Sequence, residues 1–394
     1  MPRDLPPALR ALLDTADAIM RRSSAAHVAI ARLDGLLDPE VLPTDLRAAA
    51  RKRIADSVQR TATPISGKEV AAALKRAWDD HHEEVLDHFD ESPAAVRSDA
   101  QVHHGAQDGT RLAITVQRPG VAQQLRSDLS LLDLLVAPLG GVLPGLDASR
   151  ALREVRERAL DELDLEHEAS AQRQAARALR RAGAGVRVAA PRTDLCSHDV
   201  LVVEHVEGPT LAEAAPADPG AAARALIRLA VGAPRALGVV FAELRPDEIV
   251  HGDDGLVVRR LGAAREVAAE RVDAARDALR ALREDDAGAF AQAVGRLGAL
   301  PDEDAHAVHA IARELAADLL SGPARLDAAV LSERADRALA RVGELVAIAQ
   351  RATPDPADLW PARMVAQLVA TLATLEATED WGALALEALE EGWS

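Results

Sequence analysis

A predicted β-hairpin carries a threonine at a position from which a lysine could bind a phosphate group. Between residues 101 and 116, apolar residues alternate with other residues across an Asp108-Gly109 dipeptide. This pattern is typical of two antiparallel strands joined by a tight turn. Thr115 stands in the middle of the second strand and carries no charge. No lysine follows Lys75, so chemistry that needs a lysine later in the chain is excluded.

Two acidic residues, Glu162 and Asp164, could place carboxylates near a nucleotide or a metal ion. They lie in residues 151–182, where many glutamate-arginine pairs at i,i+4 spacing predict one long amphipathic helix. On such a helix the same carboxylates can equally be solvated and purely structural. The residues alone leave both interpretations open.

Composition limits the classes of function. A chain of 394 residues, 48% of them hydrophobic, is too long for one compact core and predicts two lobes or domains. Its net charge of −17 argues against nucleic-acid binding, because a phosphate backbone would be repelled. The single cysteine, Cys196, excludes an internal disulfide and offers no zinc-ligand spacing. We therefore expect a reducing compartment and no metal site.

The apolar stretch Leu129–Leu146 is the strongest candidate for membrane contact. Asp133, Pro138 and Pro144 interrupt it, whereas a spanning helix needs about 20 consecutive apolar residues. The N-terminal residues hold charges and prolines where a signal peptide has its apolar core. We expect a cytoplasmic protein whose contact with a membrane is at most peripheral.

The order of the elements predicts an α+β, two-lobed fold of the protein-kinase kind. Helices are predicted before the hairpin, two short β-rich segments after the long helix, and helices from residue 212 onward, interrupted only by a small hairpin within residues 249–262. We expect a helical N-terminal extension (1–60), a small β-containing lobe (61–208) and a mostly helical second lobe (209–394).

Several motifs resemble the UbiB (AarF-like) family of atypical kinases. The segment "FDESPAAVRSDAQVHHGAQDGTRLAITVQRPGV" is similar to the family's alanine-rich loop, AQVH motif and VKVQRPGV strand. "ELDLEHEA" resembles the ExD motif with its following glutamate-alanine pair, and "VLVVEHVEGPTL" resembles the strand and hinge before the second lobe. With a similar C-terminal tail, the resemblance covers nearly the whole chain. In the N-terminal KxGQ motif, however, Arg32–Gly35 departs from the family pattern.

The same resemblance implies that the catalytic positions have changed. Thr115 replaces the strand lysine. In "FAELRPDE", Glu243 takes the place of the catalytic aspartate and Glu248 that of a metal-binding asparagine. Arg260 replaces the metal-binding aspartate, where its charge would repel magnesium. If the lobe folds like a kinase, we expect Glu243, Arg245, Glu248 and Arg260 to crowd one cleft and neutralise one another.

The resemblance also predicts a degenerate nucleotide cleft, with Glu243 as an inactive catalytic residue. Its predicted cofactor-binding residues are Ser98, Gln101, Thr115, Glu162, Asp164, Glu204, Arg260 and Gly262. Gln101 and the nearby His103 can equally be structural. Arg118-Pro119-Gly120 is expected to form a turn that starts the next helix.

The predicted function is that of a pseudokinase, a regulatory or scaffold protein linked through the family to isoprenoid quinone or lipid metabolism. ATP is expected to bind weakly at most, magnesium is not expected, and the partner is a protein, a lipid or an isoprenoid. One alternative is an active kinase or ATPase with rearranged catalytic residues. A second alternative is a lipid-binding module at the membrane surface.

Overall fold

The computed structural model describes residues 44–129, 147–252, 255–298 and 300–394, with His27, Ala31 and Leu42. The helices predicted before residue 44, the degenerate KxGQ region and residues 130–146 of the apolar stretch lie outside the described residues. Among the helices that are described, none is long and apolar enough to cross a bilayer.

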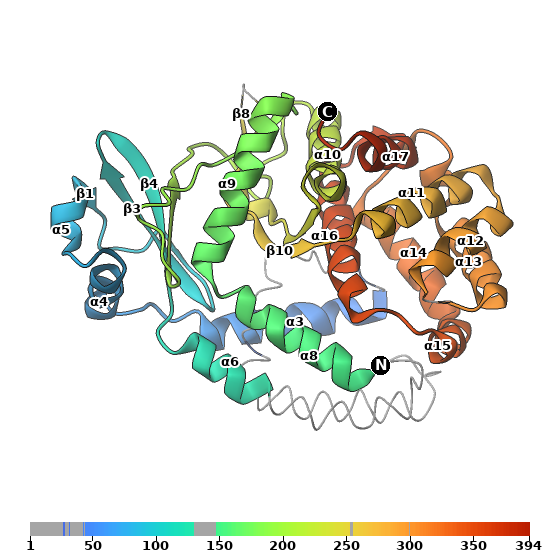
Figure 1. Cartoon of the computed structure of the whole chain (residues 1–394), viewed down its shortest axis with the longest axis horizontal. Coiled ribbons are helices and arrows are strands. Elements are labelled where there is room, and N and C mark those ends of the chain that lie inside the picture. Colours follow the sequence, from blue (N-terminus) through green and yellow to red (C-terminus); the bar gives the residue numbers. More distant parts are fainter. Residues whose placement is uncertain are drawn as a thin grey trace.

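The first half of the chain builds the smaller lobe and the helices beside it (Figure 1). Its elements are α3 (Thr44–Thr61), α4 (Gly67–Trp78), α5 (His82–Val85), β1 (His88–Phe89), β2 (Ala95–Val96), β3 (Ala100–Gln107), β4 (Thr110–Gln117), α6 (Val121–Leu129), α8 (Ala148–Asp161), α9 (Leu165–Ala182), β5 (Val186–Val188) and β6 (Val200–Glu204).

The second half builds the larger, mostly helical lobe. Its elements are α10 (Pro219–Leu237), β7 (Val239–Glu243), η3 (Pro246–Glu248), β8 (Ile249–Gly252), β9 (Gly255–Val258), β10 (Gly262–Glu266), α11 (Ala269–Glu284), α12 (Ala287–Leu297), α13 (Asp302–Leu320), β11 (Ala324–Arg325), α14 (Ala328–Ala340), α15 (Val342–Arg351), η4 (Pro356–Asp358), α16 (Leu359–Leu375), β12 (Thr378–Glu379) and α17 (Trp381–Glu391).

The predicted hairpin is confirmed as the centre of the small lobe's sheet. β3 pairs with β4 in antiparallel register, β4 pairs with β6, and β1 and β2 both pair with β3. The turn residues Asp108 and Gly109 have φ angles of 50° and 73°. Both angles are positive, as a tight turn between right-twisted strands requires, and Asp-Gly tolerates them better than most dipeptides.

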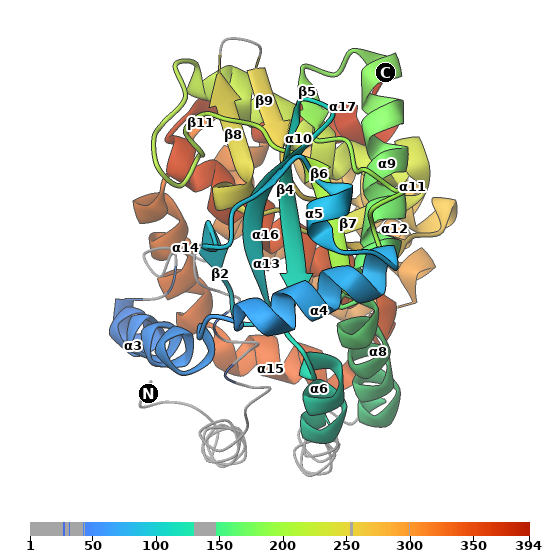
Figure 2. The same cartoon turned by 90° about the vertical axis from the view of Figure 1, so that its left-hand side faces the viewer.

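The two faces of this sheet are covered by different helices. Leu112, Ile114 and Val116 of β4 pack in one buried cluster with residues of α4. Ala113 packs on the opposite face, against a cluster that includes Leu165 and Ala169 of α9. Because side chains alternate along a strand, Thr115 lies on the α9 face. Figure 2 shows α4 crossing in front of β4.

The single long helix predicted for residues 151–182 is wrong, because the chain breaks it into α8 and α9. Asp164 ends the continuity by capping α9: its Oδ1 accepts hydrogen bonds from the backbone N–H groups of Glu166 and His167, at 3.1 and 3.2 Å. An aspartate cap stabilises a helix start, and its extended backbone cannot continue the previous helix. The break lets α8 and α9 take different directions (Figure 1).

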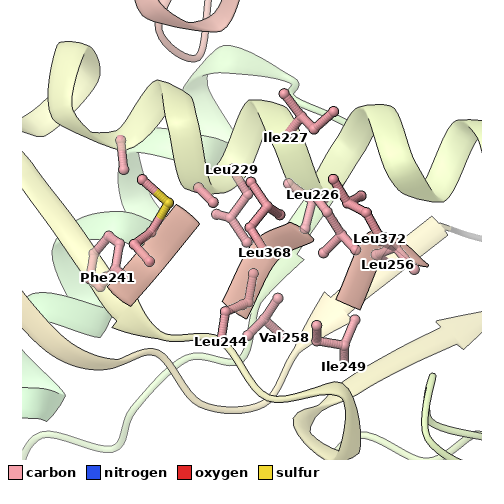
Figure 3. Close-up of a cluster of buried hydrophobic side chains, with 14 of the residues drawn as sticks. Leu226, Ile227, Leu229, Phe241, Leu244, Ile249, Leu256, Val258, Leu368 and Leu372 are labelled. Carbon is pink, nitrogen blue, oxygen red and sulfur yellow. The ribbon is translucent and has the colours of Figure 1, made fainter. Parts of the chain in front are cut away.

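The core of the large lobe lies between α10, α16 and short strands. Figure 3 shows Leu226 and Leu229 of α10 beside Leu368 and Leu372 of α16, with Phe241 of β7 in the same cluster. The predicted small hairpin is confirmed as β8 and β9, although residues 253 and 254 at its tip are not described.

The prediction that this hairpin alone interrupts the helices after residue 212 is wrong. β7 and β10 form a second antiparallel pair, with Gly262 opposite Glu243, and β11 pairs with β12. In addition, β5 pairs in parallel with β9. A strand that precedes β6 in the chain therefore belongs to the sheet of the large lobe.

Helix α3 is attached to the large lobe. The backbone N–H and the hydroxyl of Thr44 both donate to the Asp336 carboxylate of α14, each at 3.0 Å. The Arg47 guanidinium donates to the hydroxyl of Ser332 on the same helix. The other end of α3 reaches the loop that follows β2, where Thr61 and Arg97 line one pocket. The helix therefore spans both lobes.

Candidate functional site

A cleft with a volume of about 170 Å³ lies where the loop after β2 meets the segment that follows β7. Both lobes and α3 contribute to its walls. The charged and polar residues that line it are Thr61, Arg97, Ser98, Asp99, Glu243, Arg245, Asp247 and Arg260. Three predicted site residues, Ser98, Glu243 and Arg260, are thus brought together.

Arg260 forms a buried ion pair with Glu168 of α9. Its Nη2 donates to Oε2 of the carboxylate at 2.7 Å and its Nε donates to Oε1, so the pair is bidentate. The side chains of Arg260 and Glu168 are only 12% and 6% exposed. Burial by itself would lower the pKa of Arg260, but the charges of Glu168 and Glu243 raise that pKa well above its ordinary value. Arg260 is a fixed cation.

The pairing of Glu168 departs from the arrangement in protein kinases. There, a lysine on a β-strand pairs with a glutamate on the adjacent helix and orients the nucleotide phosphates. Here the strand position is Thr115, whose side chain is buried on the sheet face that α9 covers. The helix glutamate binds Arg260 of the other lobe instead. The cation that pairs with Glu168 thus comes from the second lobe, at the position where the resemblance predicts a metal-binding aspartate.

Glu243 and Glu162 are joined through Arg363 of α16. Arg363 Nη1 donates to Glu162 Oε1 at 2.7 Å, and its Nη2 lies 3.6 Å from Glu243 Oε2. The guanidinium also lies over the ring of Trp360, 5.5 Å from the centroid, a favourable cation–π distance. Gly262 faces Glu243, and a Cβ atom there would lie 3.3 Å from Glu243 Cβ. Arg363 therefore pairs with Glu243 from α16, and the lack of a side chain at Gly262 leaves room for Glu243.

Arg97 carries a second set of ion pairs across the cleft. Its guanidinium donates to Glu248 and lies 3.4 Å from Asp247, while Arg245 Nε donates to Asp247 at 2.9 Å. Burial would lower the pKa of Arg97, but Glu248 and Asp247 raise it overall. Of the four residues expected to crowd one cleft, Glu243, Arg245 and Arg260 line it, and Glu248 pairs with the cleft residue Arg97. Glu243 also acts on the charge of Arg260, and Glu168, Arg97, Asp247 and Arg363 add further partners.

The loop that carries Ser98 is held by Arg118. The Arg118 Nε donates to the carbonyl of Ser98 at 3.1 Å, and Nη2 donates to the carbonyls of Arg97 and Thr63. Pro119 and Gly120 then form the turn expected before the next helix, which begins at Val121. The Arg-Pro-Gly sequence thus fixes the cleft wall.

Other predicted site residues lie away from the cleft. Gln101 and His103 pair in register with Val116 and Ile114, so they share the face of the sheet that α4 covers. Gln101 Oε1 accepts from the Ile65 backbone at 2.8 Å, and Gln101 Nε2 lies 2.7 Å from His103 Nε2. This buried network anchors the segment before α4.

Asp164 and Glu204 also take positions outside the cleft pocket. Asp164 caps α9, and its carboxylate lies 3.5 Å from His198 Nδ1. Glu204 is the exposed last residue of β6, at the entry to the segment that joins the lobes. The structure therefore gathers Ser98, Glu243 and Arg260 in one pocket, with Glu162 beside it and Gly262 against Glu243.

Sequence reasoning missed Arg97 and Arg363 as site residues. Arg97 lies within the quoted alanine-rich loop, and the excess of carboxylates nearby was the signal that a cation was needed. Arg363 lies 201 positions after its partner Glu162, and no local pattern marks it. In the described parts of the chain, no group of three or more His, Cys, Asp or Glu side chains is placed to hold a metal ion.

The segment between the lobes carries a histidine with a depressed pKa. Burial, followed by the neighbouring His104 and two arginines, lowers the pKa of His205 to about 4. The two imidazole rings lie 4.3 Å apart between centroids. In the unfolded chain a histidine has a pKa of about 6.5. The unfolded state therefore binds more protons between these values, so His205 lowers stability as pH falls from about 6.5 to 4.

This gives a prediction for pH dependence. Replacing His205 with glutamine should reduce the fall in the free energy of unfolding, measured with urea, between pH 7 and pH 5. The ring resonances of His205 should titrate near pH 4 by NMR. A His205 ring that titrates near pH 6.5 in the folded protein would contradict the prediction.

Comparisons with known proteins agree with the predicted kinase-like fold. A family model described as the ABC1 atypical kinase-like domain matches residues 57–258. The mitochondrial atypical kinase coq-8 of Caenorhabditis elegans is 31% identical over 156 residues, which are 39% of this chain and 20% of that protein. The probable protein kinase UbiB of Cronobacter sakazakii is 29% identical over 202 residues, or 50% of this chain and 36% of that protein. The matched segments span little more than a third of these relatives at most.

Among solved structures, the Rv3197–erythromycin complex from Mycobacterium tuberculosis has a similar fold. The TM-score is 0.60 at 20% sequence identity, and the match covers 86% of each chain. At this identity the likeness concerns the fold alone. The predicted two-lobed, kinase-like α+β fold is confirmed.

Proposed function

The chain belongs to the ABC1 atypical kinase-like family, as its resemblance to UbiB predicted, and we propose that within this family it is a pseudokinase. It uses the kinase-like fold as a regulatory or scaffold protein and does not transfer phosphate from a magnesium nucleotide. Its partner is a protein or a lipid-pathway component, in keeping with the family's link to isoprenoid quinone metabolism.

One observation carries this proposal: the buried, bidentate pair between Arg260 and Glu168. Phosphoryl transfer depends on positioning and on neutralising phosphate charge with a lysine and metal ions. Arg260 places a permanent positive charge where a metal-binding carboxylate is needed, and it binds the glutamate that a strand lysine would use. Arginine at position 260 therefore has two effects. It removes a metal-binding carboxylate, and it binds Glu168, the residue with which a strand lysine would pair.

The electrostatics of the cleft support the same conclusion. Arg97, Arg260 and Arg363 bind carboxylates around the cleft. A nucleotide phosphate would have to displace these carboxylates from guanidinium groups that are 12–28% exposed, and breaking a largely buried ion pair is costly. We therefore expect the cleft to bind a nucleotide weakly at most.

ATP turnover by the purified chain tests the proposal. With magnesium or manganese, the wild type should hydrolyse ATP no faster than Glu243→Ala, and magnesium should add nothing to any thermal stabilisation by ATP. Turnover that Glu243→Ala abolishes would instead establish an active kinase or ATPase with rearranged catalytic residues.

The non-catalytic role has a separate test. If deletion of the gene causes a growth defect, wild type and Glu243→Ala should rescue it equally. Rescue by the wild type alone, with both proteins present at equal levels, would contradict a scaffold function.

A further inference from the structure

The large lobe contains an apolar cavity that is separate from the cleft. Its volume is about 730 Å³, and it lies among α10, α11, α13, α14, α16 and α17. None of the residues that line it lines the cleft. Its walls are mostly leucine and valine, represented by Leu279, Leu315, Leu319, Leu331, Val365 and Val369.

The size of this cavity calls for an occupant. Protein interiors are close-packed, and voids larger than a water molecule are few. A volume of about 730 Å³ lies instead within the range of about 300–1,000 Å³ that small-molecule sites occupy. An apolar lining of this extent gains nothing from water, so the chemistry of the walls favours a long hydrocarbon group.

The cavity reaches the surface beside apolar side chains. Val365, which lines it, is 48% exposed, and Leu359, six residues earlier on α16, is 49% exposed. In the described part of the chain these two are the exposed large hydrophobic residues. The exposed Val365 marks the entrance, whereas Leu359 lies outside the lining, and an apolar entrance suits a ligand that arrives from a lipid phase or a carrier.

The cavity lining includes three polar residues, and two of them satisfy each other. Arg271 and Asp358 form a bidentate pair. The third, Arg334 of α14, donates from Nη2 to Asp318 at 2.6 Å and from Nη1 to the Val330 carbonyl at 3.2 Å. Its Nε is buried and has no hydrogen-bond partner among the residues that the structure describes. A buried donor without an acceptor is costly and calls for a partner.

We propose that this cavity binds a single-chain fatty acid, with its hydrocarbon chain between α11, α13 and α16 and its carboxylate at Arg334. A planar carboxylate can take two N–H groups of one guanidinium, including the unsatisfied Nε. The exposed carboxylate of Asp318, whose side chain is 70% exposed, can be released to water in exchange. This proposal is independent of the catalytic state of the cleft.

Binding to the delipidated full-length chain tests it first. The fluorescent fatty acid cis-parinarate should bind with one site per chain, and palmitate should displace it. Cetyl alcohol, which has the same chain without the charge, should displace it about tenfold less well, a difference of about 1.4 kcal/mol. The absence of saturable binding would overturn the proposal.

Matched variants then locate the site. Val365→Trp should obstruct the entrance and weaken parinarate binding about tenfold or more, whereas Leu359→Trp, equally exposed on the same helix but outside the lining, should bind as the wild type does. Because position 365 is half exposed, the variant should fold, and circular dichroism checks this. Unchanged parinarate binding by Val365→Trp would contradict the placement of the fatty acid in this cavity.

The head-group contact has its own pair of variants. Arg334→Met should remove the preference for palmitate over cetyl alcohol, while Arg337→Met, one turn further along α14, should keep it. A preference retained in Arg334→Met would overturn the assignment of the carboxylate. Concentration-dependent dimers that bind no parinarate and are disrupted by Val365→Trp would show instead that a second copy covers the entrance.

Discussion

Replacing Arg260 with methionine should lower the free energy of unfolding by about 3–5 kcal/mol. The change leaves the carboxylate of Glu168, 6% exposed, without its bidentate guanidinium partner in a buried place. Removing one member of a buried ion pair usually costs more than the pair contributes, because the remaining charge stays desolvated. Urea denaturation at pH 7 measures the effect.

Two further variants separate this effect from a general loss of charge. Arg337→Met, which breaks an exposed pair with Glu333, should cost at most about 0.5 kcal/mol. In the double variant Arg260→Met with Glu168→Leu, much of the lost stability should return, since both charges are gone. If the free energy of unfolding of Arg260→Met lies within about 1 kcal/mol of the wild-type value, the buried pair does not stabilise the fold.

The second large effect on stability is expected when a positive charge is placed on β4 at position 115. Thr115→Lys alone should destabilise the protein, because its ammonium enters the α9 face while Arg260 already binds Glu168. Arg260→Asp alone should be worse, since it places a second carboxylate near Glu168. Together the substitutions should be less destabilising than Arg260→Asp alone, with a coupling energy of about 1–3 kcal/mol.

Function should follow the same non-additive pattern. Only the double variant should gain magnesium-dependent binding of ATP, measured as a thermal shift that requires both ATP and magnesium, because the lysine and the metal ligand act as one unit. Thr115→Val combined with Arg260→Asp is the matched control without the new lysine. Magnesium-dependent binding by either single variant would contradict the claim that the two groups act as one unit.

The local patterns of the sequence predicted the elements whose contacts are local. The hairpin around Asp108-Gly109 and the β8–β9 hairpin each join neighbouring residues, so alternation and turn chemistry are sufficient to find them. β7 and β10 were missed because each pairs with a strand about twenty residues away and follows or precedes helical sequence. The break at Asp164 was missed because the helical periodicity continues on both sides of the cap.

The site shows the same division. Thr115, Glu243 and Arg260 were found because motifs fix their positions in the chain. Their partners were not, since Arg363 reaches Glu162 and Glu243 only when α16 packs beside the cleft. The four charged residues were expected to neutralise one another; the charge of Glu243 does raise the pKa of Arg260, and Glu168, Arg97 and Arg363 add further ion pairs. The sequence indicates which charged residues need a partner. Tertiary packing determines which residues become those partners.

The attachment of α3 has a consequence for motion. Kinase lobes open and close about the connecting segment on the microsecond to millisecond timescale. Here Arg260–Glu168 and Arg97–Glu248 cross between the lobes, and α3 fastens to Asp336 of the large lobe while its far end reaches the loop after β2. Opening would have to break all of these contacts at once. These contacts join the lobes at several places, so we expect the cleft to open less readily than one held by the connecting segment alone.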